Sequence, residues 1–299
     1  MQIAAAGNML YHLMVTTEQT KCSYLEVTSM RRVIAILTDF GTGDWYLGAM
    51  KGVIARINPE VLMVDITHEI APCSIAEASF ALKASYRVFP DNTVFLVVVD
   101  PGVGGERRAV ALRAGRWFFV GPDNGVFGLV LESETPPTCV SLRVEKTAES
   151  ATFHGRDVFA PAAAKLSRGM KLDELGTPCT NLVRSAFPKP HVLTETELLG
   201  EIVHVDRFGD LITNVSAETI PKTEGAPDVL VMTFPRKNMS ISRVARRYSE
   251  LAGTEAGTLI GSSGYLEVAV FHDSAARCFG IQRGEPFHLT LRPVRRATK

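Results

Sequence analysis

The chain has 299 residues, and its 32 Lys and Arg residues balance 32 Asp and Glu residues, so the formal net charge is zero. This balance provides no electrostatic footprint for nucleic acid or an anionic membrane surface, and no run of about 18 apolar residues occurs that could span a bilayer. The length predicts two domains, each with its own core, and a small molecule is the expected partner.

The first 30 residues are expected to form a tail outside the fold. They carry no basic residue before Lys21, and His12 interrupts their apolar stretch, which argues against a secretory signal. The alternative is that Met30 is the natural start of the chain. At Arg31 the pattern changes to RRVIAILTDFG, which is typical of a charged entry into a buried parallel strand that ends in an abrupt turn.

A pattern of strand, helix, strand, helix and strand follows. The spacing of apolar residues predicts a helix from Tyr46 to Asn58, ended by the following proline. Ser74 is the expected N-cap of a second helix, with Glu77 at the capping-box position. The segments LMVDIT and VFLVVVD are predicted to be buried strands. This alternation indicates a mostly parallel sheet with helices in an α/β domain.

The organisation changes after residue 108. Hairpin-like strands are expected between residues 108 and 144, followed by a helix from Arg156 to Ser167. We place the N-terminal α/β domain at 31–185 and a proline-containing linker at 186–199. Short strands separated by turn residues are predicted in 200–299, which favours a smaller antiparallel β-barrel or sandwich: EIVHVD, LITNV, VLVMTF, YLEVAVF and FHLTLR.

The five cysteines are scattered along the chain, at Cys22, Cys73, Cys139, Cys179 and Cys278. Their odd number and the absence of a CxxC pair are typical of reduced thiols rather than of a disulfide framework. We therefore expect a cytoplasmic protein.

Polar residues follow the predicted strands, at the edge where an open α/β sheet binds its ligands. The first strand ends in TDFGTGD, which contains Asp39 and Asp44, and the third ends in DPGVGGER, which contains Asp100 and Arg107. Neither glycine-rich loop is expected to hold a phosphate, because Tyr46 replaces the last glycine of a dinucleotide fingerprint and the second loop leads into a strand. The glycines of the second loop are expected to bring Asp100 and Arg107 together.

His154 lies directly before the predicted helix, in TFHGRDVFAPAAAKL. An Asp, an Arg and a His in one crevice can orient a water, accept its proton through a relay and stabilise developing negative charge. A capping or packing histidine is the alternative interpretation. No metal is expected, because Arg107 would repel a cation and the histidines show no ligand spacing.

Two loops of the C-terminal segment are candidates for ligand binding. GSSGY, at 261–265, lacks the GxSxG spacing of a nucleophile elbow and precedes a strand, so we expect a binding loop rather than serine chemistry. Asp206 and Asp210 bracket Phe208 and Gly209 in DRFGDLITN, for which a simple hairpin turn is the alternative.

Seven segments, in the same order along both predicted domains, resemble the S-adenosyl-L-methionine hydroxide adenosyltransferases, a family related to fluorinases and chlorinases. The resemblance covers the chain from about Arg31 to its C-terminus. It implies hydrolysis of S-adenosylmethionine to adenosine and methionine, by attack of water or hydroxide on the ribose C5′, without a cofactor. It also implies a homotrimer with each site between two subunits. The segments are ILTDFGTGDWYLGAMKG, VDITHEI, VVVDPGVGGERR, VGPDNGVF, FHGRDVFAPAAAKL, DRFGDLITN and GSSGYLEVAV.

The resemblance also implies a role for each matching residue. Asp100, Arg107 and His154 match the water-activating positions of the family. The implied substrate-binding residues are Asp39 for the ribose diol, Asp44, Asp206 and Ser262 for the methionine moiety, and Phe208 and Asp210 for adenine.

Halogenation is disfavoured by differences from the halogenating relatives. Those enzymes carry a tyrosine where this chain has Asp100, and a Tyr-Ser pair where it has His154-Gly155. An acid beside a halide site would repel the halide. The insertion of the fluorinases is also absent, because AVALRAGRWFF continues without interruption.

Three departures from the family pattern leave other functions open. Asp210 stands where an amide is common, Phe271 replaces an expected asparagine, and Cys73 replaces a large aromatic residue. An ionised Asp accepts from the adenine amino group but cannot donate to a ring nitrogen. The alternatives are a hydrolase of another adenosyl compound and a non-catalytic protein that binds adenosine or S-adenosylmethionine. The residues Asp100, Arg107 and His154 favour catalysis, because binding alone needs no water-activating group.

Overall fold

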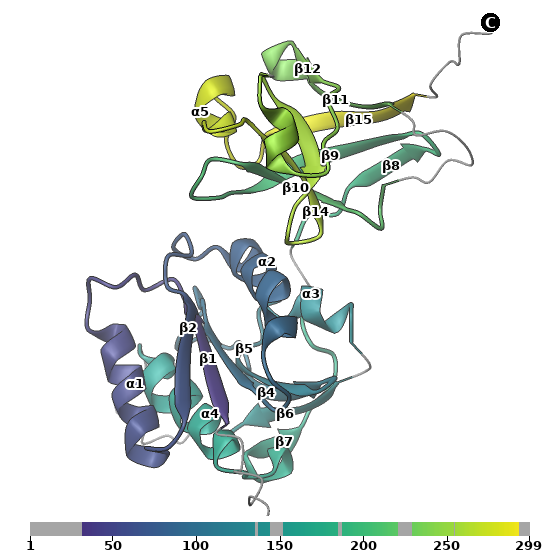
Figure 1. Cartoon of the computed structure of the whole chain (residues 1–299). Helices are drawn as coiled ribbons and strands as arrows, with labels where there is room; N and C mark the ends of the chain where they lie inside the picture. The colour runs from purple at the N-terminus through teal and green to yellow at the C-terminus, as the bar shows by residue number, and fades with distance from the viewer. Residues whose placement is uncertain are drawn as a thin grey trace, which may run out of the picture. The chain divides into compact units, whose positions relative to one another are not determined.

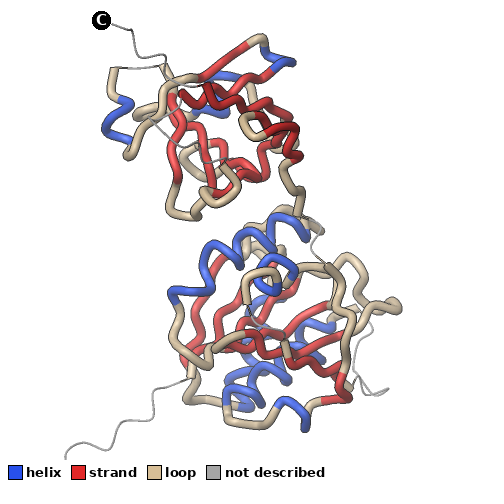
Figure 2. The backbone as a smooth tube through the Cα atoms, turned by 90° about the vertical axis from the view of Figure 1, so that its right-hand side faces the viewer, coloured by secondary structure: helices blue, strands red, loops and turns tan. Residues whose placement is uncertain are grey.

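The structure is a computed structural model that describes residues 32–134, 137–143, 152–184, 187–220, 229–253 and 255–292. The tail expected at residues 1–30 lies outside these ranges. The described residues form two β-sheets (Figure 1). Helices lie between several strands of the first sheet, and only short helical segments lie among the strands of the second (Figure 2). Within the described ranges, no helix is long and apolar enough to cross a membrane.

The N-terminal sheet has seven strands in the order β2-β1-β3-β5-β4-β6-β7. Its first four strands in this order pair in parallel, and the remaining pairings are antiparallel. The expected α/β class is confirmed, with the hairpin of β4 and β5 turning a parallel sheet into a mixed one. The strands are β1 (Val33–Thr38), β2 (Leu62–Thr67), β3 (Val94–Val98), β4 (Ala109–Ala114), β5 (Trp117–Pro122), β6 (Thr138–Leu142) and β7 (Gly176–Pro178).

The burial of the strands depends on their place in this order. β1 and β3 are central and fully buried, as their continuous apolar runs predict. The expectation of a buried strand at LMVDIT is wrong, because β2 is the edge strand and its residues are exposed or half-buried. An apolar run therefore identified the strand but not its position in the sheet.

Helices cover both faces of the N-terminal sheet. Helices α1 (Tyr46–Ile57) and α4 (Ala160–Ser167) pack side by side on one face, and α2 (Ile75–Ser85) and α3 (Gly128–Leu131) lie on the other (Figure 1). The helix expected from Arg156 begins instead as a π-helical turn, η2 (Gly155–Phe159), which continues into α4. Single π-helical turns occur frequently at functional sites. The short 3₁₀ helices here are η1 (Tyr86–Val88) and η3 (Leu172–Glu174).

The capping box expected at α2 is not formed. Ser74 is the N-cap residue, but its buried hydroxyl has no hydrogen-bond partner among the described residues. Glu77 turns away from this position, and its Oε2 accepts from the backbone N–H of Ala71 at 3.3 Å. The carboxylate therefore stabilises the loop before the helix rather than the helix end itself.

The C-terminal sheet is antiparallel throughout and forms a barrel-like core, in the order β12-β11-β15-β9-β10-β14-β13, with β8 paired to β9. The five segments predicted as strands are all strands. The linker expected at 186–199 contains β8 and the start of β9. The elements are β8 (His191–Thr194), β9 (Glu197–Val205), β10 (Leu211–Ser216), β11 (Val229–Phe234), η4 (Pro235–Lys237), β12 (Met239–Ile241), η5 (Tyr248–Leu251), β13 (Gly257–Ile260), β14 (Tyr265–Ala269), α5 (Ala275–Phe279) and β15 (Pro286–Arg292).

Candidate functional site

A cavity of about 360 Å³ lies beyond the carboxyl ends of β1 and β3, where an open α/β sheet places its ligands. Asp39 enters it from the loop after β1, Asp100 from the loop after β3, and His154 from the turn before α4. Three segments that are distant in the sequence thus supply an acid, a second acid and an imidazole to one space.

Arg107 holds the carboxylate of Asp100 with a two-pronged contact. The Nε of Arg107 donates to Asp100 Oδ1 at 2.9 Å and to Oδ2 at 3.0 Å, and its Nη2 also donates to Oδ2. Both side chains are largely buried, and the guanidinium also lies 5.2 Å from the ring centre of Phe159. This geometry fixes the carboxylate in one orientation at the cavity.

The same Arg107 Nη2 donates to Nδ1 of His154 at 2.8 Å. His154 is only 8% exposed, and burial together with the adjacent positive charge of Arg107 lowers the pKa of its imidazole. The ring is therefore neutral at physiological pH. Although His154 precedes η2, its side chain makes no capping hydrogen bond, so the structure does not support the capping alternative.

The glycines after β3 permit the approach of Asp100 and Arg107. A Cβ at Gly102 would lie 3.2 Å from Cγ of Arg107, which is tight packing against the side chain that reaches Asp100. Gly104 adopts a φ of 75°, in the left-handed region that favours glycine. The loop therefore serves as a compact backbone path between Asp100 and Arg107, as the sequence predicts.

Aromatic rings surround the mouth of this cavity. Phe153 packs edge-to-face against Phe40, Trp45 and Tyr46, with ring centres 6.0, 5.7 and 5.2 Å away. Phe40, Tyr46 and Phe153 line the cavity, and Trp45 is 60% exposed. Sequence reasoning did not single out Phe153, although its position directly before His154 was an available signal. These rings form an apolar wall beside Asp100, Arg107 and His154.

Asp39 and Asp44 follow the same strand but have different surroundings. Asp39 lines the cavity, and its Oδ2 accepts from the backbone N–H of Cys73 at 2.9 Å. Cys73 also lines the cavity and has a φ of 65°. Asp44 is exposed in the loop before α1 and does not line this cavity.

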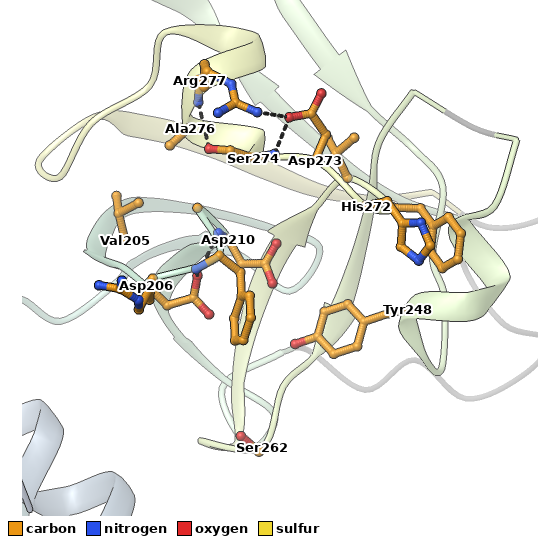
Figure 3. A pocket seen from close by; sticks show the side chains of 15 residues that line it. Val205, Asp206, Asp210, Tyr248, Ser262, His272, Asp273, Ser274, Ala276 and Arg277 are labelled. Carbon is orange, nitrogen blue, oxygen red and sulfur yellow. Dashed lines mark hydrogen bonds and ion pairs between the residues drawn. The ribbon is translucent and has the colours of Figure 1, made fainter.

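A second, larger cavity of about 1110 Å³ lies in the C-terminal sheet at the turn between β9 and β10 (Figure 3). It is lined by four residues that the sequence singles out, Asp206, Phe208, Asp210 and Ser262, and also by Tyr248. The two cavities have no lining residue in common.

The turn is closed by Asp206, as the hairpin alternative predicts. Its Oδ1 accepts from the backbone N–H groups of Phe208 at 2.9 Å and Asp210 at 2.8 Å. Gly209 adopts a φ of 88°, and a Cβ there would collide with Ser274. The arrangement leaves the ring of Phe208 79% exposed at the tip of the turn.

Asp210 is only 6% exposed, and burial, with the nearby acids Asp206 and Glu267, raises its pKa to about 6. Glu267 is also buried, and burial raises its pKa as well. The hydroxyl of Tyr248 donates to Oε1 of Glu267. Figure 3 shows Tyr248 extending into the cavity opposite Asp210. Tyr248 and Glu267 were missed from the sequence, where neither residue stands in a recognisable motif.

The structure therefore divides the sequence-predicted residues between two places. It brings Asp100, Arg107 and His154 into direct contact, with Asp39 beside them. It groups Asp206, Phe208, Asp210 and Ser262 around the larger cavity, and it leaves Asp44 outside the lining of both. In the part of the chain that the structure describes, no group of three or more His, Cys, Asp or Glu residues could hold a metal ion.

Two solved structures resemble this chain over most of its length. An uncharacterised conserved protein from Thermotoga maritima has a TM-score of 0.79 at 35% identity and covers 86% of this chain and 99% of its own. A conserved hypothetical protein from Thermus thermophilus has a TM-score of 0.67 at 36% identity, with the same coverage.

The characterised relatives include hydrolases and, at lower identity, halogenating enzymes. The (R)-S-adenosyl-L-methionine hydrolase of Thermus thermophilus is 37% identical over 86% of this chain and 99% of its own length. The enzyme of the same name from Methanocaldococcus jannaschii is 30% identical over 83% of this chain and 92% of its own length. A fluorinase from an Actinoplanes species is 29% identical over 64% of this chain and 74% of its own length.

Family models describe both parts of the chain. The model of the SAM hydroxide adenosyltransferase N-terminal domain matches residues 34–176, and that of the C-terminal domain matches residues 200–288. These ranges contain both cavities and every residue of the Asp100, Arg107 and His154 trio. The chain therefore belongs to the SAM hydroxide adenosyltransferase family.

Proposed function

We propose that this protein hydrolyses S-adenosyl-L-methionine to adenosine and L-methionine, by attack of water on the ribose C5′. The observation that carries the proposal is the contact of one guanidinium, Arg107, with both Asp100 and His154 at the end of the parallel strands. The hydrolases from Thermus thermophilus and Methanocaldococcus jannaschii match most of the chain, which supports the same reaction.

Asp100 is the group that accepts the proton of the attacking water. Among the described residues, its Oδ1 accepts only from Nε of Arg107, which leaves a second lone pair for a water in the cavity. Arg107 fixes this oxygen in place before the substrate binds. Such preorganisation avoids the cost of reorienting the acceptor during the reaction.

His154 orients the water from the other side. Because a guanidinium has donors but no acceptor, Nδ1 of His154 must be the acceptor in their hydrogen bond, and the ring proton of the neutral imidazole is on Nε2. His154 therefore acts as a hydrogen-bond donor to the water oxygen. One group that donates and one that accepts hold a single water in one orientation for attack.

The charge change of the reaction favours a dry site. When a nucleophile with developing negative charge attacks a sulfonium ion, the charges of both reactants are lost, so bulk water would stabilise the reactants more than the transition state. The aromatic rings of Phe40, Tyr46 and Phe153 exclude water from this side of the cavity. Positioning of the two reactants can contribute about 7–11 kcal/mol to lowering the barrier.

The remaining residues suit the parts of the substrate. The carboxylate of Asp39 has one oxygen held by the Cys73 amide and a second oxygen for the ribose hydroxyls. We assign the methionine moiety to Asp44, Asp206 and Ser262, and adenine to Phe208 and Asp210. The exposed ring of Phe208 provides a flat apolar surface for a base.

We further propose a homotrimer in which two subunits complete each site. The two cavities share no lining residue, and the rings of Trp45 and Phe208 expose apolar surface that a subunit contact would bury. Sedimentation of the native protein tests this, and a monomer with full activity would contradict it. The scattered cysteines favour a reducing, cytoplasmic location, and the zero net charge favours no role for nucleic acid or a membrane.

A second candidate is the hydrolysis of another adenosyl compound. The three residues that depart from the family pattern all line a cavity: Cys73 the smaller one, Asp210 and Phe271 the larger one. Phe271 stacks on His272 with 4.0 Å between ring centres, which fills space that a smaller residue would leave open. Turnover of a series of adenosyl sulfonium compounds separates this candidate from the first.

The experiment that tests the proposed function is incubation of the purified protein with S-adenosylmethionine, with and without chloride, followed by chromatography of the nucleosides. Adenosine in equal amounts in both samples is the expected result. A chlorinated nucleoside would show halogenation, and bound but intact substrate would show a binding protein. An Asp100→Ala variant is the matched control for contaminating hydrolase and should produce no adenosine above background.

A further inference from the structure

A pair of thiols lies on the N-terminal sheet, away from the polar residues of the candidate site. In the register of β6 and β7, Val140 is opposite Pro178, which places Cys139 opposite Cys179. The backbone N–H of Cys179 donates to the carbonyl of Cys139 at 2.9 Å, and the two Sγ atoms lie 2.7 Å apart. Both cysteines have free thiols in this structure.

We propose that Cys139 and Cys179 form a reversible dithiol–disulfide couple, a modification site that is independent of the proposed function. Residues directly opposite each other in an antiparallel pair have Cα atoms about 4.5–5.5 Å apart, which lies within the range that a disulfide spans. Their side chains project from the same face of the sheet. The S–S bond can therefore form without moving the strands.

The two thiols differ in exposure and therefore in the order in which they react. Cys139 is 5% exposed, and burial raises the pKa of its thiol, whereas Cys179 is partly exposed. Both line a cavity of about 430 Å³, which is large enough for the end of a small disulfide reagent. Cys179 is therefore the thiol that an oxidant meets first, and Cys139 is the resolving thiol.

Arg108 anchors the segment that follows Cys179. Its guanidinium is held by Asp123, with Nε to Oδ2 at 2.9 Å, and donates to the carbonyls of Thr180 at 2.9 Å and Asn181 at 2.7 Å. The positive charge is thus fixed beside the segment that follows Cys179. These bonds hold the segment after Cys179 in place, so that Cys179 stays opposite Cys139.

The oxidant we infer is a low-molecular-weight disulfide such as glutathione disulfide. The Cys179 thiolate attacks one sulfur of the reagent and releases the first glutathione thiolate. The Cys139 thiol then loses its proton to the released glutathione thiolate as it attacks Sγ of Cys179, and the second glutathione thiolate leaves. The two cysteines lose two electrons and two protons in total, and the reagent becomes two molecules of glutathione.

The test uses the native full-length chain, equilibrated with glutathione disulfide, alkylated with iodoacetamide and digested without reduction. The expected result is one linked peptide pair that joins Cys139 to Cys179 and disappears after treatment with dithiothreitol. A chain whose Cys139 and Cys179 both stay alkylatable would overturn the proposal. A stable glutathione adduct on Cys179, or a link of either cysteine to Cys22, Cys73 or Cys278, would overturn it as well.

Two variants complete the test. Cys179→Ser, which changes a partly exposed side chain, should abolish the link. A variant with Cys73→Ser and Cys278→Ser, two exposed cysteines, should form the link to the same extent as the native protein. Far-UV circular dichroism of each variant checks its fold, and the result with the native chain stands without either variant.

Discussion

Arg107 donates a hydrogen bond to Nδ1 of His154 across 2.8 Å, and this contact sets the chemical character of the histidine. A guanidinium has donors but no acceptor, so the lone pair of Nδ1 is occupied and Nε2 carries the ring proton. In this state His154 donates to a water but cannot take its proton at Nε2. The proton acceptor in the proposed reaction is therefore the carboxylate of Asp100.

Replacement of His154 by alanine and by glutamine distinguishes a donor from a base. We expect His154→Ala to lower kcat by roughly 10²–10⁴-fold, as for the loss of a positioned group that handles the attacking water. His154→Gln should retain at least ten times the activity of the alanine variant, because its amide N–H can still donate. Steady-state kinetics with S-adenosylmethionine measures both.

Equal losses in the two variants would instead assign proton acceptance to the imidazole. Binding of substrate, measured by calorimetry at low temperature, serves as the control. It should change far less than kcat in either variant, because the proposed role of His154 is to orient the water and not to hold the nucleoside.

The pH dependence of the reaction follows from the lowered pKa of His154. Burial and the charge of Arg107 lower this pKa from its ordinary value of 6.5. The neutral, active ring therefore persists below pH 6.5, and activity should fall only as the pH decreases through the lowered value. Arg107→Gln removes the nearby charge, so its acid limb should move to higher pH. If the activity of the native protein already falls at or above pH 6.5, the pKa of His154 is not lowered and the prediction is wrong.

The buried pair of Asp100 and Arg107 should affect stability as well as catalysis. Arg107→Ala leaves the Asp100 carboxylate buried without its partner, which we expect to cost about 3–5 kcal/mol of unfolding free energy. Asp100→Ala with Arg107→Ala removes both charges and should be less destabilising than Arg107→Ala alone. Urea denaturation of the three proteins measures the difference. A double variant less stable than the single one would contradict the pairing.

Asp210 should limit stability at neutral pH. Its pKa of about 6 lies above the ordinary value of 3.8, so the folded chain binds this proton more tightly than the unfolded chain. The contribution of protonated Asp210 to the unfolding free energy is therefore fully present below about pH 4, and it is lost as the pH rises to about 6. Asp210→Asn should raise the unfolding free energy at pH 8 by about 1–3 kcal/mol and change it little at about pH 3.5, below the ordinary pKa of the carboxyl. The exposed Asp44→Asn is the control, and a similar gain there would point to a general charge effect.

The strands of both sheets were predictable because each is a run of apolar residues bounded by turn residues. Position within a sheet was not, as β2 shows, because an edge strand packed on one face can still be apolar in sequence. The capping box at Ser74 and Glu77 failed for a different reason. The local pattern is correct, but the Glu77 side chain has a competing donor at Ala71.

The contact between Asp100 and Arg107 was predictable from the sequence, because both residues lie in one loop. Asp100 and Arg107 are seven residues apart, joined by glycines that permit their contact, whereas His154 reaches Arg107 from 47 residues away. Only the resemblance to the family connected His154 to them. The bond from Tyr248 to Glu267 joins a 3₁₀ helix to a strand, and neither residue stands in a pattern that indicates it.

The measurement that tests the central claim most directly is turnover of S-adenosylmethionine in ¹⁸O-labelled water, with mass spectrometry of both products. Attack of water on C5′ predicts that adenosine carries one ¹⁸O atom, at its 5′ hydroxyl, and that methionine carries no label beyond slow carboxylate exchange. Labelled homoserine together with methylthioadenosine would instead show attack on the amino-acid side of the sulfonium, and it would contradict the role assigned to Asp100 and His154.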